Sequence, residues 1–364
     1  MRKFIRYLIL TGYILFLIAL LLSCLARFVS PAVFWPLAFF GLAYPMLLLV
    51  NLVFLGYFLF RRKWKSVLIT LAVILLSWQN LSNLFQPFSS GNEPPEGSFK
   101  VMSFNARNFD LYNWTNNKET RNEIFRMIKE EDADILCFQE FYKDKIQYFN
   151  TLDTILQFQK AKYYHEAYPV HVTNKFFFGV AAFSRFPIIE RGTILFPGSD
   201  NATIFLDIVI DHDTVRLYNC HLESIRFDDK DYRFLDSLRL KINDKQIAEA
   251  RNILSKLKSA FIKRAGQADK IDAHIRQCPY PVILCGDFND TPFSYTYRRI
   301  RGELCDAFRE SGRGIGKSYS GKFPSFRIDY IFYDRKISSY SYKTGRTGLS
   351  DHAPIMAWLN ISKD

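Results

Sequence analysis

The stretch Val282-Ile283-Leu284-Cys285-Gly286-Asp287-Phe288-Asn289-Asp290 guides the interpretation of the whole chain. Its apolar start is typical of a strand that is buried on both faces of a sheet. The apolar run stops at Gly286, and a carboxylate, Asp287, and an amide, Asn289, follow it. This order predicts a core strand that carries both polar side chains to its C-terminal end. The alternative is a polar turn that only caps the strand.

Other predicted strands end in the same way. Strands are predicted over 100–104, 134–138, 176–183, 202–210, 214–219, 327–333 and 355–359, and helices over about 118–130 and 231–275. The polar residues beside these strand ends are Asn105, Glu140, His221, Asp329, Asp351 and His352. Strands alternate with helices in the first half of the domain and form hairpins later. This order predicts an α+β sandwich in which helices cover two packed sheets.

The N-terminal part of the chain has a different composition. Residues 7–26 and 28–60 contain no charged side chain over 20 and 33 residues, respectively. Both stretches reach the roughly 20 apolar residues that cross a bilayer. We therefore predict a transmembrane region over 1–86, with helices at about 7–26, 33–60 and 66–85. A linker over 87–98 and a catalytic domain over 99–364 follow.

Positive charges beside these segments predict an orientation in the membrane. They are Arg2, Lys3 and Arg6 before the first segment, Arg27 after it, and Arg61, Arg62, Lys63 and Lys65 before the third. The pattern predicts a multi-pass protein of the cell membrane whose N-terminus is cytoplasmic and whose catalytic domain is extracytoplasmic. If the third segment only lies on the membrane, the domain is cytoplasmic instead.

Charge and cysteine content narrow the possible classes of protein. Of the net charge of +12, residues 1–99 and the remainder each carry +6. A mildly basic domain is compatible with an anionic substrate but lacks the strong basic footprint of a dedicated nucleic-acid binder. The six cysteines show no zinc-binding spacing. Cys137, Cys220 and Cys285 are predicted to be buried thiols, while a Cys278–Cys305 disulfide stays open.

The polar residues at the strand ends suit one kind of chemistry. Carboxylates without cysteine ligands favour a hard divalent cation such as Mg²⁺ or Mn²⁺. Two histidines among them, His221 and His352, can stabilise developing negative charge or transfer protons. Metal-assisted hydrolysis of a phosphoester needs these groups, because the metal polarises the phosphoryl group and a carboxylate positions water.

Six short motifs carry a resemblance to a known family. They are Phe104-Asn105-Ala106-Arg107, Phe138-Gln139-Glu140, Asn219-Cys220-His221-Leu222, Gly286-Asp287-Phe288-Asn289, Arg327-Ile328-Asp329-Tyr330-Ile331 and Ser350-Asp351-His352-Ala353-Pro354. In order and approximate spacing they resemble the DNase I-like endonuclease/exonuclease/phosphatase superfamily over about residues 99–361. The resemblance implies a four-layer α/β/β/α sandwich and a hydrolase that acts on ester bonds.

The resemblance also implies the residues that hold the metal. Glu140 would be the principal ligand, Asn105 would help to hold the metal or Glu140, and Asp351 would lie at or near the ion. Asp287 would orient or deprotonate the attacking water.

For the phosphate itself, the resemblance implies contacts from His221 and Asn289. His352, positioned by Asp329, would stabilise the pentacovalent state. Arg107 would bind the substrate. It stands where many abasic-site nucleases have Asp, so the motif is more similar to the deoxyribonuclease and sphingomyelinase branches.

We therefore predict a membrane-anchored, divalent-metal-dependent phosphoesterase that hydrolyses phosphodiester or phosphomonoester bonds. Its expected partners are the lipid bilayer and a phosphoester substrate, either a nucleic acid or a phospholipid or sphingomyelin headgroup. The sequence implies no protein partner. The alternative is a catalytically silent membrane protein that binds phosphate-bearing ligands or acts as a scaffold.

Overall fold

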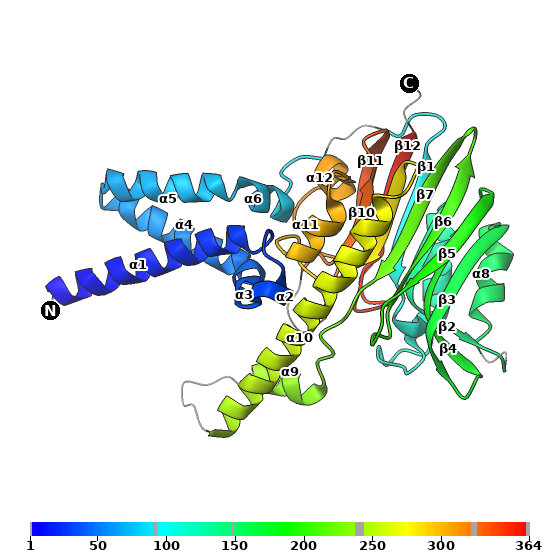
Figure 1. Ribbon diagram of the computed structural model, residues 1–364, viewed down its shortest axis with the longest axis horizontal. Coiled ribbons are helices and arrows are strands. Elements are labelled where there is room, and N and C mark those ends of the chain that lie inside the picture. Colours follow the sequence, from blue (N-terminus) through cyan, green and yellow to red (C-terminus); the bar gives the residue numbers. More distant parts are fainter. Residues whose placement is uncertain (1, 90–92, 147–148, 237–243, 322–325, 362–364) are drawn as a thin grey trace.

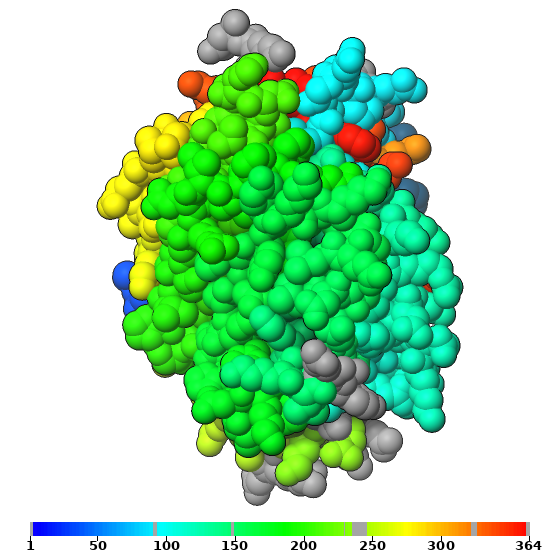
Figure 2. All heavy atoms as spheres, turned by 90° about the vertical axis from the view of Figure 1, so that its right-hand side faces the viewer, coloured from blue at the N-terminus to red at the C-terminus, as the bar shows by residue number. Residues whose placement is uncertain are grey.

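The computed structural model describes residues 2–89, 93–146, 149–236, 244–321 and 326–361 (Figure 1). Its N-terminal helices extend away from one side of two packed sheets. They are α1 (Arg2–Leu25), α2 (Pro31–Phe34), α3 (Pro36–Leu42), α4 (Tyr44–Phe60), α5 (Trp64–Leu76) and α6 (Trp78–Leu84). Figure 2 views the molecule from the side that lies away from these helices, and the blue N-terminal residues are almost hidden behind the rest of the chain. The helical region therefore projects from one side only.

Two of the three predicted membrane helices are broken in the structure. Helices α3 and α4 meet at a bend of 64°, and α5 and α6 at one of 63°. Pro45 in the first turn of α4 has no N–H to continue the preceding helix. At the second bend, Ser77 Oγ donates a hydrogen bond to the carbonyl of Ile74 at 2.8 Å, a contact that bends helices. By length and composition, α1 can cross a membrane, and up to three segments can if each bent pair is one span.

The rest of the chain forms two six-stranded sheets. The first contains, in order, β11 (Ile337–Thr344), β12 (Ile355–Ile361), β1 (Phe99–Asn105), β2 (Ile135–Asp144), β4 (Phe176–Ser184) and β3 (Tyr163–Val172). The second contains β5 (Ile188–Leu195), β6 (Ala202–Ile210), β7 (Asp213–His221), β8 (Val282–Asp287), β10 (Asp329–Tyr333) and β9 (Cys305–Asp306). The pairs β1–β2 and β7–β8 are parallel, and the others are antiparallel.

Alternation of side chains along the strands produces the layers. In β2, Ile135 and Cys137 belong to the core between the sheets, whereas Leu136 and Phe138 face the outer helix layer. Helices α7 (Thr120–Glu131) and α8 (Thr151–Gln159) cover the first sheet. Helices α10 (Asp244–Ile275) and α11 (Tyr295–Arg301) cover the second. The predicted four-layer α/β/β/α sandwich is confirmed.

The remaining short elements are η1 (Arg107–Asp110), α9 (Asp229–Asp236) and α12 (Ala307–Ser311). All six cysteines lie in the described part of the chain and are free thiols, so Cys278 and Cys305 are not joined. Cys137, Cys220 and Cys285 are buried, as predicted.

Candidate active site

The pairing of β7, β8 and β10 brings polar residues together where these three neighbouring strands of the second sheet begin or end. Parallel pairing of β7 with β8 sets His221 opposite Asp287, and antiparallel pairing of β8 with β10 sets Asp329 opposite Asp287. In the first sheet, parallel pairing places Asn105 opposite Gln139, one residue before Glu140. The site is therefore formed by strand ends of both sheets, which hold side chains with little freedom.

Gly286 determines where Asp287 lies. Its φ is 138°, and a Cβ at this position would lie 2.0 Å from the carbonyl oxygen of Cys220. Only glycine allows strands β7 and β8 to approach this closely beside the site.

Glu140 is presented to the site by an irregularity in β2. The sequence predicts that this strand ends before Glu140, but β2 continues to Asp144. The register shifts between Phe138 and Phe141, and Glu140 has a φ of 49°. Such a bulge turns a side chain out of the regular alternation, and a positive φ costs about 1–3 kcal/mol for a non-glycine residue.

Asn105 joins the carboxylates of the two sheets. Its Nδ2 donates hydrogen bonds to Glu140 Oε1 at 3.1 Å and to Asp287 Oδ2 at 2.9 Å. Its Oδ1 accepts a hydrogen bond from the backbone N–H of Arg107 at 3.0 Å. The amide is thus fully oriented, and it keeps the two carboxylates close together.

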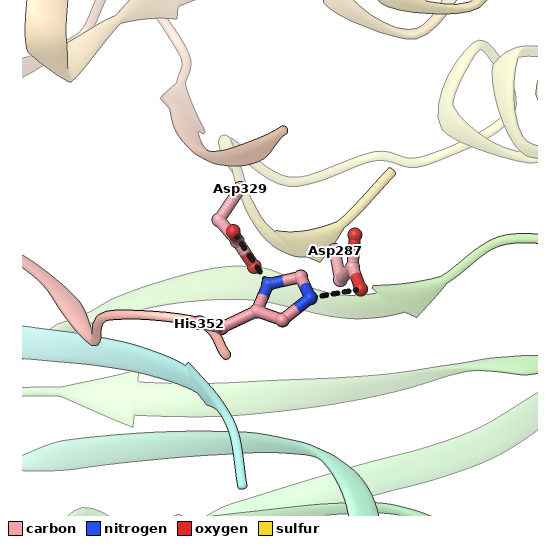
Figure 3. A group of neighbouring side chains, drawn as sticks. All are labelled: Asp287, Asp329 and His352. Carbon is pink, nitrogen blue, oxygen red and sulfur yellow. Dashed lines mark hydrogen bonds and ion pairs between the residues drawn. The ribbon is translucent and has the colours of Figure 1, made fainter. Parts of the chain in front are cut away.

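His352 lies between two carboxylates (Figure 3). Its Nδ1 is 2.9 Å from Asp329 Oδ2, and its Nε2 is 3.6 Å from Asp287 Oδ2. Burial alone would lower the pKa of His352, but the charges of Asp329 and Asp287 outweigh it and raise this pKa to about 10. The side chain is therefore an imidazolium at neutral pH, fixed on both sides.

His221 has the opposite character. Burial lowers its pKa, an effect that the charge of Asp287 only partly offsets, so the ring is neutral near pH 7. Its buried Nε2 has no hydrogen-bond partner within the described ranges and lies 4.0 Å from Asp287 Oδ2. Because a buried polar atom without a partner costs about 1–3 kcal/mol, this nitrogen is suited to a ligand.

The other predicted residues lie beside this group. The backbone N–H of Asn289 donates to Asp287 Oδ1 at 2.8 Å, and Asn289 Nδ2 donates to the carbonyl of Leu222 at 3.0 Å. Arg107 Nε is 3.6 Å from Asp351 Oδ2, and its guanidinium lies over the ring of Trp114. The structure thus brings all nine predicted site residues to one end of the sandwich.

The charges of this group fit a divalent cation. The pKa of Glu140 is raised by its burial and by the nearby charge of Asp351. Burial also raises the pKa of Asp287. Ligand atoms of Asp287, Asp329 and His352 lie within 4.8 Å of one another, but His352 already pairs with both acids. Glu140 and Asp351 line the same pocket and neither pairs with His352, so these oxygen donors are the better position for Mg²⁺ or Mn²⁺.

The pocket also contains residues that sequence patterns did not reveal. It has a volume of about 200 Å³ and is lined by Glu140, Asn289, Asp351 and His352 together with Arg226, Arg264, Tyr319 and Leu42. The ring of Tyr319 packs edge-on against His352 at 5.0 Å. Arg264 could have been found, because it is a charged residue on the apolar face of a predicted helix. No sequence signal distinguishes Arg226 or Leu42 from other residues of their types.

Comparison with solved structures supports the fold. An endonuclease/exonuclease/phosphatase family protein from Leptotrichia buccalis C-1013-b is 16% identical, covers 72% of this chain and 99% of its own, and has a TM-score of 0.50. The human Nocturnin catalytic domain with bound sulfate anion is 17% identical, covers 77% and 98%, and has a TM-score of 0.51. D. rerio TDP2 complexed with single strand DNA product is 15% identical, covers 72% and 99%, and has a TM-score of 0.50.

Family comparison divides the chain at the linker. No curated protein matches the chain. Residues 6–84 match a family described as a domain of unknown function (DUF8431). Residues 102–352, more than half of the chain, match the family described as Endonuclease/Exonuclease/phosphatase family. This protein therefore belongs to the endonuclease/exonuclease/phosphatase family, whose members hydrolyse phosphoester bonds.

Proposed function

We propose that this protein is a membrane-anchored phosphoesterase that depends on a divalent metal ion, Mg²⁺ or Mn²⁺. The observation that carries the proposal is the arrangement of Asp329, His352 and Asp287, which Asn105 connects to Glu140. A charged imidazole and a buried carboxylate beside a pocket are groups that can assist phosphoester hydrolysis by stabilising charge and by accepting a proton.

Glu140 and Asp351 are the proposed metal ligands. Asn105 directs its N–H groups to Glu140 and Asp287, which favours a role in holding Glu140 over direct coordination. When bound, the ion would polarise the phosphoryl oxygen and offset negative charge.

Asp287 is the proposed base for the attacking water. The water oxygen forms a bond to phosphorus and gives one proton to Asp287 as the ester P–O bond breaks. The departing alkoxide takes up a proton from solvent water and leaves as the alcohol. The raised pKa of Asp287 suits this role, because a base with a pKa nearer neutrality accepts a proton more readily. The imidazolium of His352, oriented by Asp329, would stabilise charge on the phosphoryl oxygens.

His221, Asn289 and Arg107 are the proposed contacts to the substrate. His221 supports this role most directly, because its Nε2 lacks a protein partner in the described structure. Arg226 is a further candidate, since it lines two neighbouring pockets. One is the pocket of about 200 Å³ with Glu140 and His352, and the other has about 170 Å³ and is lined by Glu140 and His221. The human Nocturnin catalytic domain was solved with bound sulfate anion and D. rerio TDP2 with single strand DNA product, and these anions support a phosphoester substrate here.

The helical region is the proposed anchor, with three spans that place the catalytic domain outside the cytoplasm. The apolar α1 and the positive charges around residues 2–6 and 61–65 support this orientation. A reporter fused after Asp364 should read extracytoplasmic. A cytoplasmic reading would contradict the three-span arrangement without affecting the catalytic proposal.

The full chain purified in detergent tests the catalytic proposal. We expect it to hydrolyse bis(p-nitrophenyl) phosphate, to lose this activity in excess chelator, and to regain it with Mg²⁺ or Mn²⁺. Asp287→Asn, which keeps the size of the side chain, is the matched control and should be inactive. Full activity in chelator would contradict the metal, and a folded but inactive wild-type protein in both metals would favour a catalytically silent role.

A further inference from the structure

The helical region contributes directly to the candidate active-site pocket. Leu42, the last residue of α3, lines the pocket together with Phe261 of α10. The other apolar residues of the lining are Ile225, Phe227, Phe326 and Ile328. One part of the pocket is therefore apolar, although the catalytic part is strongly charged.

Arg264 adds a cation to the same pocket. It is fully buried, and its Nε and Nη1 donate to Asp290 Oδ2 at 3.2 Å and to the carbonyl of Glu223 at 3.0 Å. Its Nη2 has no hydrogen-bond partner in the structure as described. A buried guanidinium N–H of this kind is suited to an oxygen of a bound molecule. The lining of the pocket thus combines apolar side chains with a buried guanidinium that has one unpartnered nitrogen.

Close packing holds Leu42 in position. A Cβ at the neighbouring Gly41 would lie 3.2 Å from the carbonyl oxygen of Phe293 and 2.9 Å from Cβ of Ala26. The ring of Phe39 packs edge-on against Phe261 at 5.2 Å. This end of α3 is therefore part of the pocket wall and not a loosely attached neighbour.

The loop after β8, the strand that ends at Asp287, enters the helical region. Phe293, which follows Asn289 closely, packs against the ring of Tyr44 at 4.7 Å within the apolar core of the helices. Asn83 of α6 donates from Nδ2 to the carbonyl of Pro292 at 3.0 Å and accepts from Arg327 Nη2 through its backbone carbonyl at 3.2 Å. The helices thus contact segments on both sides of the site.

Exposed apolar side chains continue along the helices as far as this junction. On α2, which packs beside α10, Val33 is 81% exposed and Phe34 is 53% exposed. Neighbouring Phe28 is also exposed. If these side chains contact acyl chains, the pocket lies at the level of the lipid headgroups, where the phosphoester of a lipid is found.

We infer that Leu42, Phe261 and Arg264 form a substrate subsite for a lipid phosphoester. The apolar part of the lipid contacts Leu42 and Phe261, an oxygen of its polar part accepts a hydrogen bond from Arg264 Nη2, and its phosphorus faces Asp287 and His352. This inference rests on the proposed function and specifies its substrate. A nucleic acid fits less well, because its charged strand would lie against apolar side chains.

The test compares two substrates with the full chain in detergent. One is vesicles of phosphatidylcholine, phosphatidylglycerol, phosphatidylethanolamine and sphingomyelin in equal parts, followed by phosphorus NMR. The other is bis(p-nitrophenyl) phosphate. Leu42→Gln should lower kcat/KM for the lipid relative to the soluble ester by about 10- to 100-fold, the loss expected for one buried leucine contact. The loss should appear mainly in KM.

Two variants control this comparison. Leu42→Met keeps an apolar side chain and should retain lipid hydrolysis. Leu49→Gln introduces the same polarity on an exposed position of α4 and should change neither activity.

Three outcomes would overturn the inference. They are equal losses for both substrates in Leu42→Gln, hydrolysis of bis(p-nitrophenyl) phosphate without hydrolysis of any vesicle lipid, and hydrolysis of single-stranded DNA in preference to lipid. In each of these cases the proposed phosphoesterase activity stands. Hydrolysis of neither lipid nor soluble ester would overturn both proposals.

Discussion

The helical region and the catalytic domain both bury polar side chains, but of different kinds. In the helices, Thr70 Oγ1 donates to the carbonyl of Ser66 at 2.8 Å and lies 3.1 Å from the hydroxyl of Tyr13. The catalytic domain instead gathers Asp287, Asp329 and His352 within 4.8 Å. The helices thus bury neutral groups, whereas the strand ends bury charges beside one another.

This difference distinguishes polar groups that stabilise packing from polar groups that are placed for a chemical function. A buried hydroxyl that bonds to a backbone carbonyl contributes modestly to stability and leaves nothing unsatisfied. Buried charges are costly unless they are paired or bind an ion. The strand ends show this cost, because burial raises the pKa of Glu140 and of Asp287. A cluster of buried ionisable side chains with shifted pKa values is typical of a functional site.

The largest expected effect concerns the paired charges. His352→Ala should lower kcat by about 10²–10⁴-fold, the range for a positioned acid–base group. Asp329→Ala should cost a similar amount, because Asp329 orients the ring and maintains its charge. The double variant should lose little more than either single variant, since groups that act as a unit are non-additive. Rates of hydrolysis of bis(p-nitrophenyl) phosphate by the wild type, the two single variants and the double variant give this comparison.

Thermal melting must show that each of these variants is folded. Multiplicative losses in the double variant would show that Asp329 and His352 work separately. Near-wild-type turnover in folded His352→Ala would remove the imidazolium from the mechanism and weaken the contrast between the two regions.

The next effect concerns the metal. Glu140→Gln should raise the Mg²⁺ concentration needed for half-maximal activity by about 10- to 100-fold, because it removes a charged ligand. Without metal, the same variant should be more stable than wild type at neutral pH. The raised pKa of Glu140 provides stability that is present below the unfolded pKa and is lost as pH rises through the folded one.

Thermal melting in chelator as a function of pH measures the expected difference in stability between wild type and Glu140→Gln. The wild-type protein should lose stability as pH rises above the ordinary range of a glutamate carboxyl, and Glu140→Gln should lose less. Parallel curves for the two proteins would argue that Glu140 is not strained by its surroundings.

The smallest effect belongs to the helices. Thr70→Val removes one buried hydroxyl with little change of shape and should destabilise the protein by about 1 kcal/mol. It should leave hydrolysis of bis(p-nitrophenyl) phosphate unchanged, since the hydrogen bonds that the structure describes for Thr70 join it to Tyr13 and Ser66 of the helical region. Unfolding in detergent and steady-state rates give the two measurements. A large loss of activity would mean that polar groups in the helices also serve catalysis.

The strands missed by sequence patterns share one position in the sheets. β3, β5, β9 and β11 are the four edge strands, whereas the predicted strands are interior. Edge strands are partly exposed, as the half-buried residues of β3 and the mostly exposed residues of β5 show. Their side chains therefore lack the apolar runs that mark a strand in the sequence.

What the sequence determined by itself was the set of polar residues that border apolar runs. Asn105, Glu140, His221 and Asp287 follow such a run and Asp329 precedes one, so a local pattern could name all five. The alternation of strands and helices likewise predicted the layers, since each element buries one face.

Only the tertiary structure decided which distant segments meet these strand ends. Arg264 and Phe261 come from α10, and Leu42 comes from α3, yet all three line the same pocket as Glu140. No local pattern can show this, because the contacts depend on how the helices pack against the second sheet. The bulge at Glu140 has the same origin, since its register is set by pairing with β4 and not by its own residues.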